Sequence, residues 1–478
     1  MEKVSRWLSA AMLIIFILLF GLGLLLGVCR PDHLSYPAAF VGGILFLGLF
    51  VLWQRRGEVP SLWQKLGERR SLALLLALCF LLNLTWVLSF RLEPTVDFAT
   101  FWSTARALAG EDVAMLKEYV ALFPHILGYS AFLSLFLRLF GSGPLVAPVV
   151  NVCLTTLSGF FLFRLTRRWR GLDAAAFVLL IWALFPSKLL YNAMVLSEPW
   201  YTCLLLAFLC LVSALETRPF SPAAAAGLGA VAGLLLRLVN AARPIAAVPI
   251  LALLIWLLLL RKERGKETRR RWLGFLALLL AVYLVTGPLW TGFARRVLGE
   301  EPAPVPGYSF YVGMNMDSMG SYSEEDMALL SHYRYDFPDS SAVQAQNQML
   351  EEARARLHDP DTRLVPLFFV KLRTFLGNDE GGAYYSLAGL SGSAYSLLAL
   401  YSNVWYYALA LLALWGALRL LRRGERRCAL LAPLYVIGLT LAQLLVEVAA
   451  RYHYSIIPML LLLAGFACAG QREDAVRS

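Results

Sequence analysis

The sequence predicts an all-α polytopic integral membrane protein with about 12 transmembrane helices. Hydrophobic residues make up 59% of the 478 residues, charged residues make up 16%, and the mean hydropathy is +0.64. A soluble domain of this size cannot bury such a composition. The apolar residues come in runs of about 20, the length that crosses a bilayer. Lys and Arg gather in a few short segments between these runs.

The apolar runs define the predicted crossings in order along the chain. They occupy 8–28, 36–53, 71–90, 144–165, 174–191, 199–215, 222–240, 244–260, 272–293, 394–420, 428–447 and 454–470. The placement of a further apolar stretch, 124–140, follows from the rule that basic loops stay in the cytoplasm. If 124–140 crossed, the basic cluster at 164–170 would lie outside. We therefore expect 124–140 to form a helix in or dipping into the outer leaflet.

The basic clusters predict the orientation in the cell membrane. They are Lys3/Arg6, Arg55/Arg56/Lys65/Arg69/Arg70, Arg164/Arg167/Arg168/Arg170, Arg261 through Arg271, and Arg419/Arg422/Arg423/Arg426/Arg427. All of them should face the cytoplasm, which also places both termini there. The net charge of +11 then reflects topology and contact with anionic membrane lipids. The same charge distribution argues against a nucleic-acid partner.

Four regions are expected along the chain. They are an N-terminal helical hairpin with a cytoplasmic loop (1–70), a main transmembrane module (71–293), an extracytoplasmic loop (294–393), and C-terminal transmembrane helices (394–478). The loop at 294–393 is too long to be a simple connector. We expect it to form a small folded cap over the outer membrane face.

Unusual charged residues concentrate on the predicted outer face. Asp97 follows the third apolar run, and Glu198 lies in a short outer turn. Lys188, Arg243 and Arg451 fall at the outer ends of their helices. Charges at such depth are costly and usually face a cavity or each other. We therefore predict one site, in which the cations hold an anion such as a phosphate and a carboxylate removes a proton from a nucleophile.

The same charged residues could instead have simple structural roles. Asp97 could cap the helix that follows it, because Asp is a favoured N-cap residue. Glu198 before Pro199 fits the start of a helix. Glu447 and Arg451 are four residues apart, so on one helix they would form an internal ion pair.

Short motifs follow one another over 71–460 in an order that resembles a known superfamily. They are Thr95-Val96-Asp97-Phe98, Phe123-Pro124-His125 with Leu139-Phe140-Gly141, Leu196-Ser197-Glu198-Pro199, Ala242-Arg243-Pro244 and Arg451-Tyr452. This order resembles the GT-C membrane glycosyltransferases. More narrowly, it is similar to the family 39-like superfamily of protein mannosyltransferases and aminoarabinose transferases. The resemblance implies a GT-C-like fold in which 71–293 is the catalytic transmembrane module.

The resemblance implies an inverting enzyme that transfers a sugar from a polyprenyl-phosphate donor to an extracytoplasmic cell-envelope acceptor, whether glycan, lipid or protein. The site residues it implies are Asp97 (the base) and Glu198 as catalytic groups, and Arg243 and Arg451 as ligands of the donor phosphate. To these we add Lys188 as a third phosphate ligand, and His125 and Tyr452 as substrate-binding residues. Phe98 departs from the eukaryotic protein O-mannosyltransferases, which have a second acid after the first. Protein mannosylation is therefore not favoured.

The sequence also bears on a metal cofactor and on alternative functions. The histidines show no metal-ligand spacing, so no metal site is predicted from them, although Asp97 and Glu198 could share Mg or Mn. The alternative function is a transporter or flippase of lipid-linked sugars. No internal repeat supports it, and Arg237 is the one deep charge that could line a path. A non-catalytic scaffold would tolerate loss of Asp97.

Overall fold

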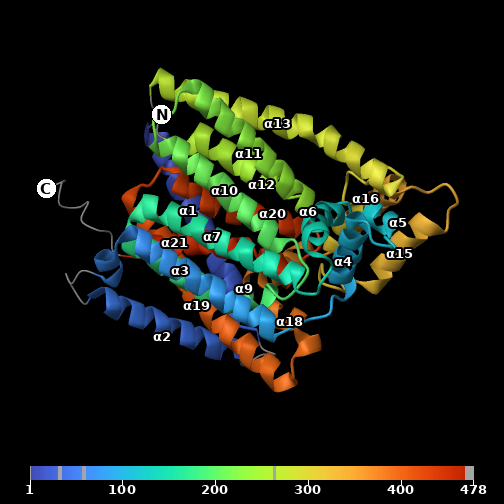
Figure 1. Ribbon diagram of the computed structural model, residues 1–478, viewed down its shortest axis with the longest axis horizontal. Helices are drawn as coiled ribbons and strands as arrows, with labels where there is room; N and C mark the ends of the chain where they lie inside the picture. Colours follow the sequence, from blue (N-terminus) through green and yellow to red (C-terminus); the bar gives the residue numbers. More distant parts are fainter. Residues whose placement is uncertain (1, 31–34, 56–60, 262–264, 469–478) are drawn as a thin grey trace.

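The computed structural model describes residues 2–30, 35–55, 61–261 and 265–468. Within these ranges every regular element is a helix. Long helices run side by side along the molecule, and several shorter ones gather at one end (Figure 1). The predicted all-α, multi-pass membrane architecture is confirmed. Predictions about Arg56 and the C-terminal tail fall outside the described residues.

In the described part of the chain, nine helices are long and apolar enough to cross a membrane. They are α1 (Glu2–Val28), α2 (Ser35–Arg55), α3 (Leu62–Ser89), α7 (Val146–Arg170), α10 (Glu198–Thr217), α11 (Pro222–Ala242), α13 (Lys266–Leu298), α19 (Gly392–Arg423), and η3 (Cys428–Leu430) continued by α20 (Leu431–Leu445). The predicted stretch 124–140 is the shorter apolar helix α6 (His125–Phe140). It packs against α4 (Val96–Ala109) and α11.

The three remaining predicted crossings coincide with shorter apolar helices. They are α8 (Leu172–Leu184) followed by α9 (Pro186–Tyr191), α12 (Ala247–Ile255) followed by η1 (Trp256–Leu260), and η4 (Ala450–His453) followed by α21 (Ile456–Ala467). Pro186 begins α9, and Pro244 lies between α11 and α12. Proline removes a helical hydrogen bond and clashes with the preceding turn. Irregular backbone at membrane depth is tolerated where protein surrounds it or where it lines a cavity.

Basic connectors of several helices meet at one end of the bundle. Arg167 Nε at the end of α7 lies 3.0 Å from Glu68 Oε2 near the start of α3. Arg170 and Arg419, from α7 and α19, each donate a hydrogen bond of 2.9 Å to Cys468 O, just beyond α21. These contacts place the basic ends of α3, α7 and α19 beside the end of α21.

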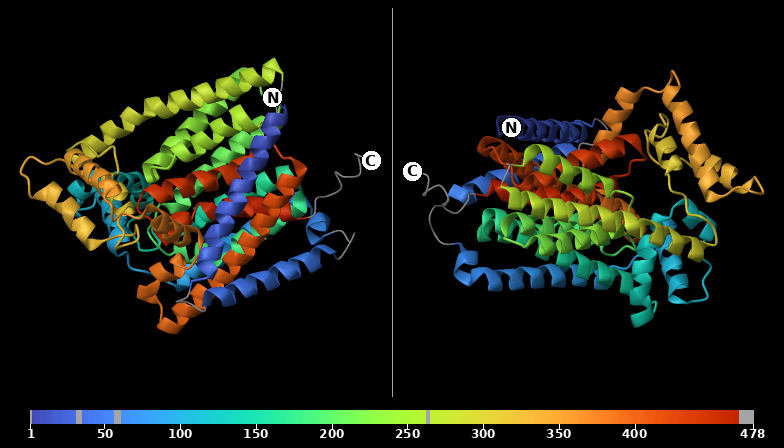
Figure 2. Two further views of the ribbon diagram at one scale, coloured as in Figure 1. Left: turned by 180° about the vertical axis from the view of Figure 1, so that it is seen from behind. Right: turned by 90° about the horizontal axis from the view of Figure 1, so that it is seen from above.

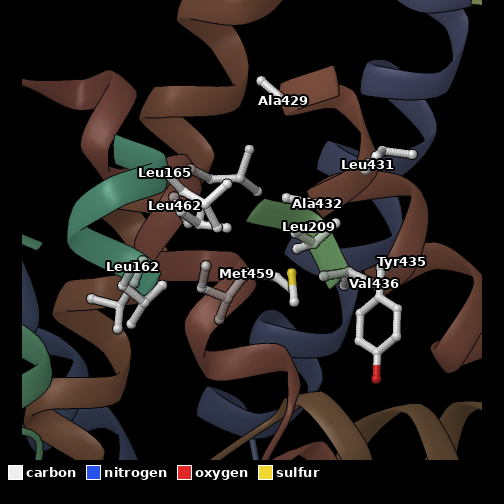
Figure 3. Close-up of a cluster of buried hydrophobic side chains, with 14 of the residues drawn as sticks. Leu162, Leu165, Leu209, Ala429, Leu431, Ala432, Tyr435, Val436, Met459 and Leu462 are labelled. Atoms are coloured by element: carbon white, nitrogen blue, oxygen red, sulfur yellow. The ribbon is translucent and has the colours of Figure 1, made fainter. Parts of the chain in front are cut away.

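The short helix α21 lies at the centre of the bundle. All of its residues are buried, as expected for a helix that is apolar on every side. It packs against α7, α8, α19 and α20, and Figure 3 shows Leu162, Leu209 and Val436 gathered around Met459 and Leu462. The approach of α19 is very close, because a Cβ at Gly416 would lie 1.9 Å from Leu463 O. Glycine is therefore required at this crossing.

The region 294–393 is helical rather than a simple loop. Its helices are α14 (Gly307–Gly313), α15 (Glu324–Tyr335), α16 (Ala342–His358), α17 (Leu364–Leu376), α18 (Gly381–Tyr385) and η2 (Leu387–Gly389). The pair α15 and α16 projects beyond the ends of the long helices (Figure 2). Helix α16 packs against α14 and against α5 (Lys117–Leu122), whereas α17 packs along α1.

Lys371 joins α17 to two other parts of the chain. Its side chain is fully buried. The Nζ atom donates hydrogen bonds to Gly313 O at 2.8 Å, Leu444 O at 2.8 Å and Val446 O at 2.7 Å. A lysine ammonium has three N–H donors, one for each of the three carbonyls. Lys371 therefore connects the end of α14 to the segment that follows α20.

Replacing Lys371 by Met is expected to destabilise the protein by about 3 kcal/mol or more, because each buried carbonyl left without a donor costs about 1–3 kcal/mol. The measurement is the melting temperature of the detergent-solubilised protein. Lys266→Met is the matched control, because Lys266 is exposed. An equal melting temperature for wild type and Lys371→Met would contradict this structural role.

Candidate active site

Several of the predicted site residues lie together at the end of the bundle opposite to the basic connectors. Asp97 lies in the first turn of α4, and Glu198 is the first residue of α10. Arg243 is the C-cap of α11, and Arg451 and Tyr452 lie on η4. The interruptions in the helices thus coincide with the residues that carry charge.

Asp97 and Arg451 form an ion pair across 354 residues of sequence, between Asp97 Oδ2 and Arg451 Nη2. The guanidinium carbon of Arg451 lies 5.2 Å from the ring centroid of Tyr385, and 5.6 Å from those of Phe98 and Tyr452. The Arg451 side chain is 12% exposed, whereas that of Asp97 is 40% exposed. Burial acts to raise the pKa of Asp97, but the Arg451 guanidinium overcomes it and holds this pKa below its usual value.

The turn that carries Asp97 is strained. Val96 has a φ of +47°, a region that β-branched residues rarely adopt and that costs of order 1–3 kcal/mol. The N-cap of α4 is Thr95, whose side chain makes no capping hydrogen bond among the described residues. Asp97 is therefore not the cap of this helix. Its carboxylate is held by Arg451 instead.

Glu198 and Arg243 form a second, more deeply buried ion pair. Arg243 Nη2 lies 2.6 Å from Glu198 Oε1, and the two side chains are 17% and 2% exposed, respectively. Glu198 begins α10 and is followed by Pro199, so the simpler expectation of a helix start is also met. A carboxylate at a helix N-terminus is favoured by the helix dipole. The pair therefore fixes the end of α11 against the start of α10.

Tyr452 lies between the two arginines. Its ring centroid is 4.5 Å from the guanidinium carbon of Arg243 and 5.6 Å from that of Arg451. Its hydroxyl donates a long hydrogen bond of 3.5 Å to Glu447 Oε1. These cation–π contacts with the Tyr452 ring hold both guanidinium groups in place.

The expected helical ion pair between Glu447 and Arg451 is wrong. Helix α20 ends at Leu445, and 446–449 have no regular structure, so the two residues do not share a helix. The backbone N–H of Glu447 donates to Ser309 O at 2.7 Å, which ties this connector to α14. No cation contacts the Glu447 carboxyl among the ion pairs of the described residues, and burial raises its pKa. Glu447 thus joins the site as a third carboxyl.

His125 and Lys188 have different surroundings from each other. His125 starts α6 and is half-buried. Burial and the charge of Arg243 lower its pKa to about 3, so the imidazole is neutral near pH 7. Lys188 is fully buried, donates from Nζ to Tyr454 O at 2.9 Å, and lies 3.0 Å above the Tyr454 ring centroid. The Lys188 ammonium is therefore held by Tyr454, which directly follows η4.

A buried histidine and aspartate anchor the segment that carries Arg451. His453 Nδ1 lies 2.8 Å from Phe375 O, and Nε2 lies 2.9 Å from Asp379 Oδ1, with both side chains 1% exposed. A carbonyl accepts hydrogen bonds only, so Nδ1 carries a proton. The second contact joins the ring to the buried carboxyl of Asp379. The two residues lie 74 positions apart, so no local sequence pattern predicts this pair.

Asp97 and Glu198, the two carboxylates that could share Mg or Mn, each contact a different arginine through one oxygen. Over the ranges that the structure describes, no group of three or more His, Cys, Asp or Glu side chains could hold a metal ion.

The sequence matches no protein-family model and no curated protein. Among solved structures, an oligosaccharyltransferase from Archaeoglobus fulgidus tethered to an acceptor peptide matches with 11% identity and a TM-score of 0.47, over 83% of this chain and 49% of that chain. ArnT from Cupriavidus metallidurans bound to undecaprenyl phosphate matches with 16% identity and a TM-score of 0.35, over 83% of this chain and 77% of that chain.

The archaeal enzyme AglB in complex with an inhibitory peptide and a dolichol-phosphate gives similar values, with 11% identity and a TM-score of 0.47 over 84% of this chain and 50% of that chain. This chain therefore spans about half the length of the oligosaccharyltransferase. At such identities and TM-scores no residue is transferred between the chains, and the site rests on the contacts of this chain alone.

Proposed function

We propose that the protein is a membrane glycosyltransferase that moves a sugar from a polyprenyl-phosphate donor to an acceptor in the cell envelope. The observation that carries this proposal is the pairing of a half-exposed carboxylate, Asp97, with an enclosed guanidinium, Arg451. The first group suits proton removal, and the second suits an anionic leaving group. Because the basic connectors lie at the other end of the bundle, the site would face the extracytoplasmic side.

The proposed reaction is a single displacement at the anomeric carbon. Asp97 takes the proton of an acceptor hydroxyl, and the acceptor oxygen forms a bond to that carbon. The bond from the carbon to the phosphate oxygen breaks, and the lipid phosphate leaves with the electron pair. Arg451 and Arg243 stabilise the negative charge that develops on the phosphate. The attack comes from the face opposite to the phosphate, so the sugar is inverted.

The remaining polar groups of the site suit contacts with the sugar. Glu447, Tyr452 and neutral His125 provide hydrogen-bond donors and acceptors without a fixed positive charge. Glu198 and Arg243 hold the ends of two helices together. We propose that the first three residues bind the transferred sugar and that Glu198 fixes Arg243.

No observation favours the transport alternative. Arg237, the deep charge that could have lined a path, donates from Nε to Tyr283 O at 3.2 Å, and its guanidinium carbon lies 4.1 Å from the Tyr283 ring centroid. It therefore joins α11 to α13 and does not face a passage. The contacts of this arginine are those of a structural residue.

The purified protein in lipid vesicles is expected to transfer radiolabelled sugar from a polyprenyl-phosphate donor to envelope material. We expect no transfer from the matching nucleotide sugar, because the sequence has no Gly-rich phosphate loop and no G-x-G-x-x-G after a strand. Protein-free vesicles are the control. Label that crosses the vesicle membrane without forming a new glycosidic bond would instead identify a carrier.

A further inference from the structure

The two ion pairs of the site differ in how easily they can open. Glu198 is 2% exposed at a helix start, so it has no room to leave Arg243. Asp97 is 40% exposed and lies on the open side of Arg451. Arg451 itself is enclosed by aromatic rings and cannot follow the carboxylate. Of the two ion pairs, the one between Asp97 and Arg451 therefore opens more easily.

We propose that the Asp97–Arg451 ion pair is a resting form of the site, and that the phosphate group of the donor displaces Asp97 from Arg451 and thereby releases the catalytic base. This inference rests on the proposed function, in which the donor carries a phosphate. In the resting form the carboxylate occupies the guanidinium that an incoming anion needs. Arrival of the donor and activation of the base are then one event.

Two features of the resting form favour the exchange. Arg451 Nε is buried and has no hydrogen-bond partner within the described part of the chain, and a buried donor without a partner is costly. A phosphate has more oxygens and more charge than a carboxylate, and it can accept two parallel hydrogen bonds from one guanidinium. The strained φ of Val96 adds to the cost of holding Asp97 where it is.

The exchange changes the charge that Asp97 experiences. The charged and titratable groups that face Asp97 are Arg451, Arg243 and His125, together with Glu447, Tyr119 and Tyr385. When a phosphate binds Arg451, Asp97 loses its nearest cation and gains an anionic neighbour. Both changes raise the pKa of Asp97 and make it a stronger base. Without donor, Asp97 remains a weak base.

The test is binding of farnesyl phosphate to the purified protein, with farnesol as the neutral probe. Asp97→Asn should bind farnesyl phosphate about fivefold or more tightly than wild type, because an amide competes poorly for the guanidinium. Farnesol should bind both proteins equally. Arg451→Gln should lose the preference for the phosphate. The matched control is Glu93→Gln, which removes one negative charge from an exposed position four residues before Asp97.

Weaker or unchanged binding by Asp97→Asn would overturn the exchange, as would equal tightening by Glu93→Gln, which would indicate net charge alone. If wild type transfers sugar from the lipid donor and Asp97→Asn still shows no tightening, the exchange falls while the proposed function stands. If no protein prefers farnesyl phosphate over farnesol and none transfers sugar, both fall.

A second measurement uses wild type alone and so does not depend on the folding of a variant. The acid limb of kcat/KM reports the free enzyme, and the acid limb of kcat reports the complex with substrate. Because Arg451 lowers the pKa of Asp97 in the free site, the limb of kcat/KM should lie at lower pH than the limb of kcat. Coincident limbs would show that donor binding leaves the Asp97–Arg451 pair intact.

Discussion

Asp97→Asn is expected to lower the rate of sugar transfer by about 10²- to 10⁴-fold, the usual contribution of a positioned general base. Asparagine has nearly the shape of aspartate and keeps an oxygen that can accept a hydrogen bond from Arg451, but it cannot take a proton. The measurement is kcat at saturating donor, in membranes matched for the amount of protein. The melting temperature is measured alongside, because the variant leaves Arg451, which is 12% exposed, without its anion.

Two further variants test whether the loss of activity comes from the loss of the base. Asp97→Glu keeps a carboxylate on a longer side chain and should retain part of the activity. Glu93→Gln changes an exposed acid of the same loop and should leave transfer unchanged. Equal transfer by wild type and Asp97→Asn would remove Asp97 as the base. The protein would then be a scaffold, or an enzyme with another base, for which Glu447 is the nearest candidate.

Sequence position was enough to find the charged residues but not their partners. Asp97 and Arg451 could be placed on the same membrane face, because each follows or precedes an apolar run. Which acid contacts which arginine depends on how α4, α10, α11 and η4 pack, and these elements lie far apart in sequence. The expected pair of Glu447 with Arg451 failed because spacing of four residues brings side chains together only on a continuous helix, and α20 ends at Leu445.

The fold was predicted in class but not in detail for a related reason. Hydropathy measures the length of an apolar run and is insensitive to a break within it, so the break between α8 and α9 at Pro186 left no signal in the run 174–191. Buried polar anchors were also missed. Lys371 binds backbone carbonyls, which leave no trace in a side-chain pattern. Asp379 and His453 lie 74 residues apart.

Arg243→Met is expected to destabilise the protein strongly, by about 3–5 kcal/mol, because it leaves the carboxylate of Glu198 buried without its cation. The loss should appear as a lower melting temperature of the detergent-solubilised protein. Glu198→Gln alone should also destabilise, because it removes the anion that compensates Arg243. The size of the effect follows from burial, since Glu198 is 2% exposed and water cannot take the place of the missing partner.

The double variant Glu198→Gln/Arg243→Met separates the ion pair from its parts. Replacing both charges by uncharged groups of similar size is often neutral, so the double variant should recover most of the stability lost by Arg243→Met. Additive losses would mean that the two residues act independently, in conflict with their contact of 2.6 Å. In the double variant Arg451 is the remaining guanidinium of the two ion pairs. If Arg243 also holds the donor phosphate, the double variant should still bind farnesyl phosphate through Arg451, but more weakly than wild type does.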